Sequence, residues 1–225
     1  GAIAIAAVTS CTTATDPAMM IAAGLLARNA AAAGLSAKPW VKTILAPGSH
    51  ATERILVRAG LMDGLAACGF HTCGFGCMSC IGNSGPLSAA MHEVADSIEL
   101  ASVLSGNRNF EGRISPDVSQ NYLMAPARVV AYALAGTMDF NFATDALGTR
   151  ADGTPIYLRE LVPSQAEVDA LVAQVVTPEV FAEDAAENAA WDAIDAGASA
   201  LFAWDEASTY VRRAPYFERF SATPA

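Results

Sequence analysis

Lysine, net positive charge and long apolar runs are scarce in this 225-residue sequence. Its lysines are Lys38 and Lys42 alone, and 13 basic against 23 acidic residues leave a formal net charge of −10. General nucleic-acid binders need a basic field, so DNA is excluded as a partner and RNA is disfavoured. Although 53% of the residues are apolar, no apolar run reaches the roughly 18 residues of a membrane-spanning helix. We therefore expect no membrane insertion.

The sequence also lacks a natural start and a disulfide framework. Residues 1–8 have neither an initiator Met nor a basic flank, so they resemble an interior strand of a longer chain rather than a signal peptide. The five cysteines show no framework spacing, which favours a reducing compartment and thiols kept for metal binding or burial. We expect a cytoplasmic location, or the mitochondrial matrix in a eukaryote.

Strand-like and helix-like segments alternate through residues 1–148. Strands are predicted at 3–8, 40–45, 70–75, 101–104 and 137–142. Helical segments are predicted at 18–33, 52–59, 62–68, 87–95, 120–124 and 127–134, the last two split by Pro126. Asp16 followed by Pro17 is typical of a helix N-cap and first helical residue. This alternation predicts an α/β domain with three layers, α/β/α, around a mainly parallel sheet.

Past residue 148 the pattern changes. Ser164 and Glu167 have the spacing of a capping box, so a helix is predicted from there to about residue 175. Pro178 opens another helix toward Trp191. From residue 196 onward the sequence has little periodicity and predicts an extended connector. We therefore divide the chain into an α/β domain at 1–148 and a helical and extended segment at 149–225.

Cys77 and Cys80 form the most distinctive motif. Two cysteines three residues apart can turn their sulfurs toward one ion, and the surrounding glycines let the backbone pass close to it. Cys11 follows a different predicted strand, and ligands collect beyond the carboxyl ends of parallel strands. Three thiolates favour an iron–sulfur cluster or zinc, with one metal position left open for a substrate. A thioredoxin-type dithiol would not need the third cysteine.

The remaining cysteines and two arginines carry weaker signals. Cys68 and Cys73 are expected to pack as small apolar residues. Arg108 and Arg113 flank a loop rich in Gly and Asn, where two guanidinium groups suit the bidentate capture of carboxylates or phosphates. The alternative is a pair of surface arginines in an acidic protein. The histidines share no pattern and are expected to be structural or exposed: His50, His71 and His92.

Four stretches taken together resemble the aconitase family, in its aconitate hydratase A type. They are TSCT at 9–12, KPWVKT at 38–43, GCMSCIGNSGPL at 76–87 and SGNRNFEGR at 105–113. Residues 208–218 further resemble the connector that precedes that family's last domain. The resemblance covers nearly the whole chain and identifies it with the third of four domains.

The resemblance implies a [4Fe-4S] cluster bound by Cys11, Cys77 and Cys80, whose fourth iron acts as a Lewis acid. Arg108 and Arg113 would contact carboxylates of a small tricarboxylate substrate, and Asn107 would line the site. The implied reaction is a step of the tricarboxylic acid cycle, the reversible dehydration and rehydration that links citrate to isocitrate through cis-aconitate.

No catalytic residue is expected within this chain. In the family, the serine general base and the His and Asp groups that handle protons lie in other domains. The remaining domains of the same enzyme are therefore expected partners, and this chain alone is expected to be inactive. A cluster edge left without those domains would be open to solvent, so we expect its loss in air.

One departure from the family pattern and two alternatives accompany this interpretation. Thr13 stands where family members usually have Asn, which is expected to alter cluster affinity or potential. A 2-methylcitrate dehydratase of the same family is one alternative, because no residue that would meet the extra methyl group is identifiable. A non-catalytic iron-sensing or RNA-binding protein is another, and the acidity of the chain disfavours its RNA-binding form.

Overall fold

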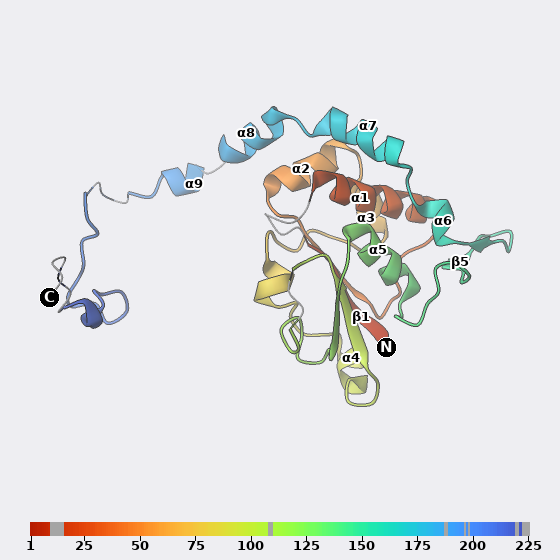
Figure 1. The fold of residues 1–225 in the computed structure, drawn as a ribbon, viewed down its shortest axis with the longest axis horizontal. Coiled ribbons are helices and arrows are strands. Elements are labelled where there is room, and N and C mark those ends of the chain that lie inside the picture. The colour runs from red at the N-terminus through yellow and green to blue at the C-terminus, as the bar shows by residue number, and fades with distance from the viewer. Residues whose placement is uncertain are drawn as a thin grey trace. The chain divides into compact units, whose positions relative to one another are not determined.

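The computed structural model describes residues 1–9, 16–107, 110–186, 189–195, 197, 199–218 and 221 (Figure 1). The chain divides into two compact units, Gly1–Glu187 and Asn188–Ala225. Among the described residues, the first unit contains the four-stranded sheet and most of the helices, and the second contains two short helical turns.

A four-stranded parallel sheet organises the first unit. Its strands are β1 (Ala2–Thr9), β2 (Lys42–Ala46), β3 (Leu100–Leu104) and β4 (Gln120–Leu123), in the spatial order β2-β1-β3-β4. Strand β1 lies at the centre and is buried from Ile3 to Thr9, which explains its continuous apolar run. Ala4 is skipped in the pairing with β3, and this bulge turns Ala4 and Ile5 toward the same core.

Helices cover both faces of this sheet, so the predicted three-layer α/β domain is confirmed. One face meets α1 (Pro17–Ala32), α2 (His50–Arg58), α3 (Met62–Ala67) and α5 (Pro126–Ala135), in a core that includes Ile3, Ala6 and Val8 of β1. The other face meets a single π-helical turn, η1 (Met78–Gly82), and α4 (Ala89–Val94). The second core therefore contains Cys80 of the predicted metal site.

Helix α1 begins as the sequence predicts. The Oδ1 atom of Asp16 accepts a hydrogen bond from the backbone N–H of Ala18 at 2.9 Å, and Pro17 is the first helical residue. Its apolar face is buried from Met20 to Ala30, between the sheet and the helices that follow later in the chain.

The segment after residue 148 packs on this same side of the domain. A two-stranded antiparallel ladder, β5 (Gly148–Thr149) and β6 (Pro155–Ile156), leads into α6 (Leu158–Leu161), α7 (Gln165–Val175) and α8 (Pro178–Ala186). Figure 1 shows α7 and α8 running over the side that carries α1 and α2. Buried residues of α6, α7 and α8 join the first core: Leu158, Leu161, Val168, Val175 and Val180.

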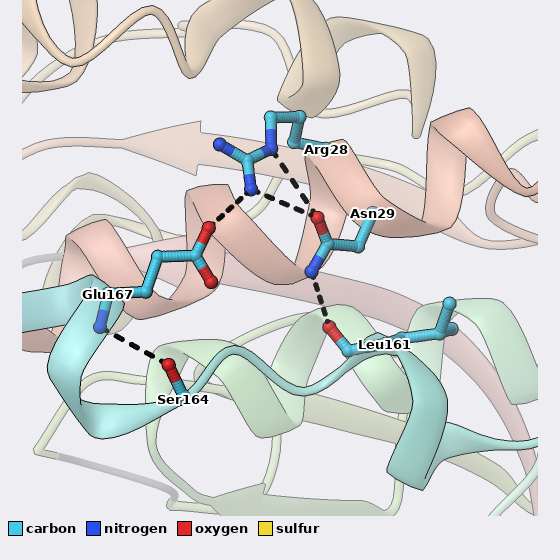
Figure 2. A network of polar contacts seen from close by, with 5 residues as sticks. All are labelled: Arg28, Asn29, Leu161, Ser164 and Glu167. Carbon is cyan, nitrogen blue, oxygen red and sulfur yellow. Dashed lines mark hydrogen bonds and ion pairs between the residues drawn. The ribbon is translucent and has the colours of Figure 1, made fainter.

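Polar contacts attach α1 to this helical segment (Figure 2). Arg28 forms an ion pair with Glu167 at 2.7 Å, and the side-chain amide of Asn29 donates to the carbonyl of Leu161 at 3.0 Å. Ser164 accepts from the backbone N–H of Glu167 at 3.3 Å and so caps α7, as predicted. Because the Glu167 carboxylate faces Arg28, the cap and the helix contact share one residue.

Two predicted strands are wrong. Residues 70–75 form only an isolated bridge between Thr72 and Leu45, after which Gly76 adopts a φ of 67° and turns the chain away from the sheet. Residues 137–142 likewise form one isolated antiparallel bridge, between Thr137 and Ala2. Each segment has enough apolar character for a strand but continues into a loop.

The predicted helical segment at 120–124 is also wrong, because Gln120–Leu123 is strand β4. A proline disfavours helical backbone in the residue before it, and Ala125 is extended with φ −61° and ψ 149°. The chain before Pro126 therefore pairs with β3, while the helix after Pro126 forms as predicted.

Among its described residues the second unit has little regular structure, and the sequence predicted an extended segment there from residue 196 onward. It contains α9 (Ala189–Asp192) and a 3₁₀ turn, η2 (Pro215–Phe217). The helix predicted from Pro178 toward Trp191 corresponds to α8 (Pro178–Ala186) and α9 (Ala189–Asp192), and residues 187–188 between them lie outside the described part of the chain. Within the described residues, no helix is both long and apolar enough to cross a membrane.

Candidate metal centre

The loops that carry the predicted ligands leave the sheet at one edge. Strands β1, β2 and β3 run parallel, so the segments after Thr9, Ala46 and Leu104 all begin at their carboxyl ends. Cys11 follows β1 but lies at 10–15, outside the described residues, and Arg108 lies outside them too. The structure places the other predicted site residues: Cys77, Cys80, Asn107 and Arg113.

Two buried hydroxyl groups join the ends of these loops. Ser105 Oγ accepts from the Thr9 backbone N–H at 2.9 Å and donates to the Thr9 carbonyl at 2.7 Å, which links the end of β1 to the end of β3. Thr9 Oγ1 donates to the carbonyl of Gly76, the residue before Cys77, at 3.1 Å. Both side chains are buried, so these bonds are shielded from competing water. Thr9 therefore fixes the Cys77 loop relative to the strand that leads to Cys11.

Cys80 lies within the tight turn η1, and Cys77 is the residue that directly precedes it. The carbonyl of Cys77 accepts from the N–H groups of Ile81 at 2.9 Å and Gly82 at 3.2 Å, and Asn83 closes a further bond to Met78 at 2.9 Å. Single π-helical turns of this kind occur often at functional sites. Cys80 is buried with 1% of its surface exposed, whereas Cys77 is half-buried.

The Cys80 thiol packs directly against the loop after β3. Its Sγ accepts from the backbone N–H of Asn107 at 3.4 Å and donates to Asn107 Oδ1 at 3.2 Å. A Cβ at Gly106 would lie 2.8 Å from this sulfur, closer than real Cβ atoms approach. Glycine is therefore required there, and the structure brings Cys80 and Asn107 together.

Asn83 connects the cysteine turn to the segment that carries Arg113. Its amide nitrogen donates to the carbonyl of Arg113 at 2.9 Å, and its Oδ1 accepts from the N–H of Gly85 at 2.7 Å. The Arg113 guanidinium lies 5.9 Å from the centre of the Phe110 ring and is half-buried. The backbone of this predicted anion-binding loop is thus fixed to the cysteine turn.

Sequence reasoning missed three features of the site and its surroundings. Thr9 and Ser105 belong to stretches that resemble the family, but nothing in the sequence predicted their hydrogen bonds. The His50 ring packs against the Phe75 ring with centroids 4.1 Å apart and the ring planes tilted by 52°, a contact that the spacing of the histidines does not predict. Lys42, at the amino end of β2, donates to two loop carbonyls. The available clues were the scarcity of lysine and its place in the family-like stretch 38–43.

The two remaining cysteines differ from each other. Cys68 is buried in the first core, and burial raises the pKa of its thiol to about 11, opposed by a backbone hydrogen bond. It packs as a small apolar residue, as predicted. The same expectation for Cys73 is wrong, because its side chain is exposed, although its backbone N–H donates to the carbonyl of Leu45 in β2 at 2.9 Å.

The donors at this edge suit a thiophilic metal or cluster. Among the described residues, no three His, Cys, Asp or Glu side chains are grouped so that they could hold a metal ion, and Cys11 is not among those residues. Two thiols on one turn, with a backbone N–H directed at one sulfur, match the ligation and sulfur hydrogen bonding of iron–sulfur sites. The donor chemistry therefore fits such a group.

Comparison with known proteins gives a consistent result. Residues 1–136 match the aconitase family (aconitate hydratase). All of this chain aligns at 49% identity with 24% of aconitate hydratase A of Corynebacterium efficiens, and at 47% with 25% of the Bacillus subtilis protein of the same name. In Thermus thermophilus, 97% of the chain aligns at 48% identity with 25% of aconitate hydratase A. The chain thus spans about a quarter of the length of these relatives. It belongs to the aconitase family.

Proposed function

We propose that this chain is the cluster-binding part of an aconitate hydratase, with Cys11, Cys77 and Cys80 as ligands of a [4Fe-4S] cluster. The observation that carries the proposal is the position of the Cys80 thiol at the carboxyl edge of the sheet. The thiol packs against Gly106 and accepts a hydrogen bond from the backbone N–H of Asn107. Family membership and the names of the relatives support the assignment of a hydratase that interconverts citrate and isocitrate.

When bound, the cluster supplies a Lewis-acidic iron for the hydroxyl group of the substrate. Residues of this chain would provide its three thiolate ligands and a hydrogen bond to one of them. Cys80 gives up its S–H proton on becoming a ligand, which ends its donation to Asn107 Oδ1 but keeps the bond from the Asn107 N–H. That N–H stabilises negative charge on the sulfur. The Asn107 side chain, which is exposed, is then available to a polar group of the substrate.

Arg113 and Arg108 are proposed to hold substrate carboxylates in this centre. The backbone of Arg113 is fixed by Asn83, and its guanidinium lies over Phe110, so it is held next to the cysteine turn. Guanidinium groups suit planar carboxylates because they can donate two parallel hydrogen bonds. The general base is proposed to come from the rest of the enzyme, since the relatives are about four times as long as this chain.

Of the two substrates considered, we propose citrate rather than 2-methylcitrate, because the similar proteins carry the name aconitate hydratase A. We propose the cytoplasm as the location, because the five cysteines of the sequence show no spacing typical of a disulfide framework. The proposed partners are a small tricarboxylate and the remaining domains of the same enzyme.

The proposal is tested by anaerobic reconstitution of the chain with iron and sulfide. A broad visible absorbance is expected in the unmodified chain and in Cys73→Ser, whose exposed thiol is the matched control. The absorbance should be lost in Cys11→Ser, Cys77→Ser and Cys80→Ser. Stoichiometric zinc retention without an iron–sulfur spectrum would overturn the proposal, as would an unaltered spectrum in all three ligand variants.

The substrate contacts are tested in the full-length enzyme. Arg113→Lys keeps the charge but removes the planar fork, so the KM for citrate should rise while cluster absorbance stays unchanged. If the variant bound citrate as well as the parent enzyme, Arg113 would be a surface residue.

A further inference from the structure

We infer that Lys42 is a positioning residue for the cluster ligands, because it holds the loop that ends the cysteine turn against the edge strand of the sheet. The inference rests on the proposed function for its consequence, and on hydrogen bonds within the chain for its geometry. Lys42 is the first residue of β2 and is half-buried. It has no place in the proposed chemistry itself.

The ammonium group of Lys42 bridges two carbonyls of one short loop. Its Nζ donates to the carbonyl of Ser84 at 2.5 Å and to the carbonyl of Pro86 at 2.9 Å. Between them Gly85 has a φ of 70°, and a Cβ there would lie 3.4 Å from Nζ. The left-handed glycine thus turns both carbonyls toward the lysine. Hydrogen bonds from a charged donor are stronger than those between neutral groups.

The held loop contains a strained residue. Asn83 ends the cysteine turn with φ 134° and ψ 152°, a region that residues with a side chain rarely occupy. Such backbone persists only where its surroundings hold it in place. On one side the Asn83 amide and the Ser84 N–H, which donates to Ile114 at 2.8 Å, bind the neighbouring loop. On the other side Lys42 holds the two carbonyls that follow.

The structure shows no carboxylate partner for Lys42 among the described residues. The two carbonyls are therefore the recorded partners of its Nζ. Its β2 neighbours are paired with β1, with Lys42 opposite Ile5, so the base of the side chain is fixed by the sheet. The lysine therefore acts as a bracket with one end in the sheet and the other in the loop.

Lys42 restricts the positions of the two thiols indirectly, through the backbone that connects Ser84 to the cysteine turn. Cys80 lies four residues before Ser84, and the intervening turn is closed by the bond from the Asn83 N–H to Met78. Release of the Ser84 and Pro86 carbonyls would let Asn83 relax toward common backbone angles, and η1 would lose its fixed end. Cys77 and Cys80 would then occupy a wider range of positions, which weakens a cluster that needs several thiolates at once.

The chain provides a matched control, because it has only one other lysine. Lys42→Met keeps the aliphatic stem and removes the charge. Lys38→Met makes the same change at a side chain that forms no hydrogen bond with another described residue. Amide hydrogen exchange of the metal-free full chain is measured first, over residues 77–86. We expect exchange there to be roughly tenfold faster in Lys42→Met, the factor that corresponds to about 1.4 kcal/mol. Lys38→Met should match the parent, and Lys42→Arg should restore much of the protection.

The reconstituted full chain provides the second readout. Cluster absorbance should decay severalfold faster under a chelator in Lys42→Met than in Lys38→Met, with partial recovery in Lys42→Arg. If exchange is faster but no variant, nor the parent, takes up a cluster, the proposed function fails while the bracket stands. If the cluster forms and both exchange and decay equal those of the parent, the bracket is refuted and the proposed function stands.

A measurement on the unmodified chain covers the case in which Lys42→Met does not fold. Amine acylation of the folded chain should be much slower at Lys42 than at Lys38, because Nζ of Lys42 donates to two carbonyls. Equal acylation of the two lysines would overturn the inference.

Discussion

A methyl group at position 106 should displace the Cys80 thiol without altering any polar group of the site. In the structure, a Cβ at Gly106 would lie 2.8 Å from Cys80 Sγ and 2.9 Å from Cys80 Cβ, with Leu104 Cδ1 at 3.3 Å. Cys80 is 1% exposed and packs in the second core, so its side chain has little space into which it can move. We therefore expect Gly106→Ala to strain the packing between the β3 loop and η1.

The magnitude follows from the cost of overpacking a core, which is typically about 1–3 kcal/mol. For a chain of this size that loss corresponds to a fall in Tm of roughly 2–12 °C. The same displacement lengthens the bond from the Asn107 N–H to the sulfur, now 3.4 Å, so cluster uptake should fall together with stability. Gly82→Ala is the matched control, since a Cβ there would meet only the Cys77 carbonyl, at 3.9 Å.

The assay combines thermal unfolding of the metal-free chain with anaerobic reconstitution. Gly106→Ala should lower both Tm and the cluster absorbance at saturation, whereas Gly82→Ala should change Tm by no more than a few degrees. If Gly106→Ala had the stability and cluster content of the parent, the close approach of the β3 loop to Cys80 would be refuted.

Three further outcomes are expected. A hydrogen bond and a charge interaction with Asp117 raise the pKa of His92. The pair therefore stabilises the fold fully below about pH 6.5, and this stabilisation is lost as the pH rises through the raised pKa. In Asp117→Asn, the free energy of unfolding measured with denaturant should lack that pH dependence. Mass-spectrometric mapping of alkylation should find Cys73 modified well before Cys68, whose thiol has a pKa of about 11. Gly64→Ala should lower Tm more than Gly106→Ala does, because its Cβ would meet the backbone of α1 at 2.6 Å.

The parts of the fold with local causes were predictable from sequence. An apolar run predicted β1, and the Asp16–Pro17 pair predicted where α1 begins. Ser164 predicted the start of α7 through the same capping chemistry. For the two helices the capping interaction lies within a few residues of the signal. Strand β1 pairs with distant strands, but a central strand buried on both faces is apolar along its whole length, and that pattern is visible in the sequence.

The wrong elements depend on pairing with distant residues. Residues 70–75 have the composition of a strand, yet only Thr72 bridges to β2 before the glycines redirect the chain. Gln120–Leu123 has weak strand character and forms β4 because β3 presents an open edge beside it. Whether such a segment joins a sheet is decided by the space next to that sheet, which a local pattern does not contain.

The candidate site also has features that were predictable from the sequence and features that were not. The rule that ligands gather at the carboxyl edge of parallel strands predicted that the loops after β1 and β3 would approach the cysteine turn, and the contact between Cys80 and Asn107 agrees with it. The ligand role of Cys11 and the anion-binding role of Arg108 stay predictions, because both residues lie outside the described part of the chain. The hydrogen bonds of Thr9, Ser105 and Lys42 were not predictable, since each one joins segments that are far apart in the sequence.

These hydrogen bonds indicate whether the chain would need a bound cluster in order to fold. A zinc finger folds only with its metal, because it has too few apolar residues to form a core alone. Here both faces of the sheet carry apolar cores, and hydrogen bonds between protein groups hold the cysteine turn through Thr9 and Lys42. The seat for Cys80 is thus formed by the fold itself. Ligation would therefore stabilise a folded chain by mass action, in proportion to the affinity of the seat, rather than cause the chain to fold.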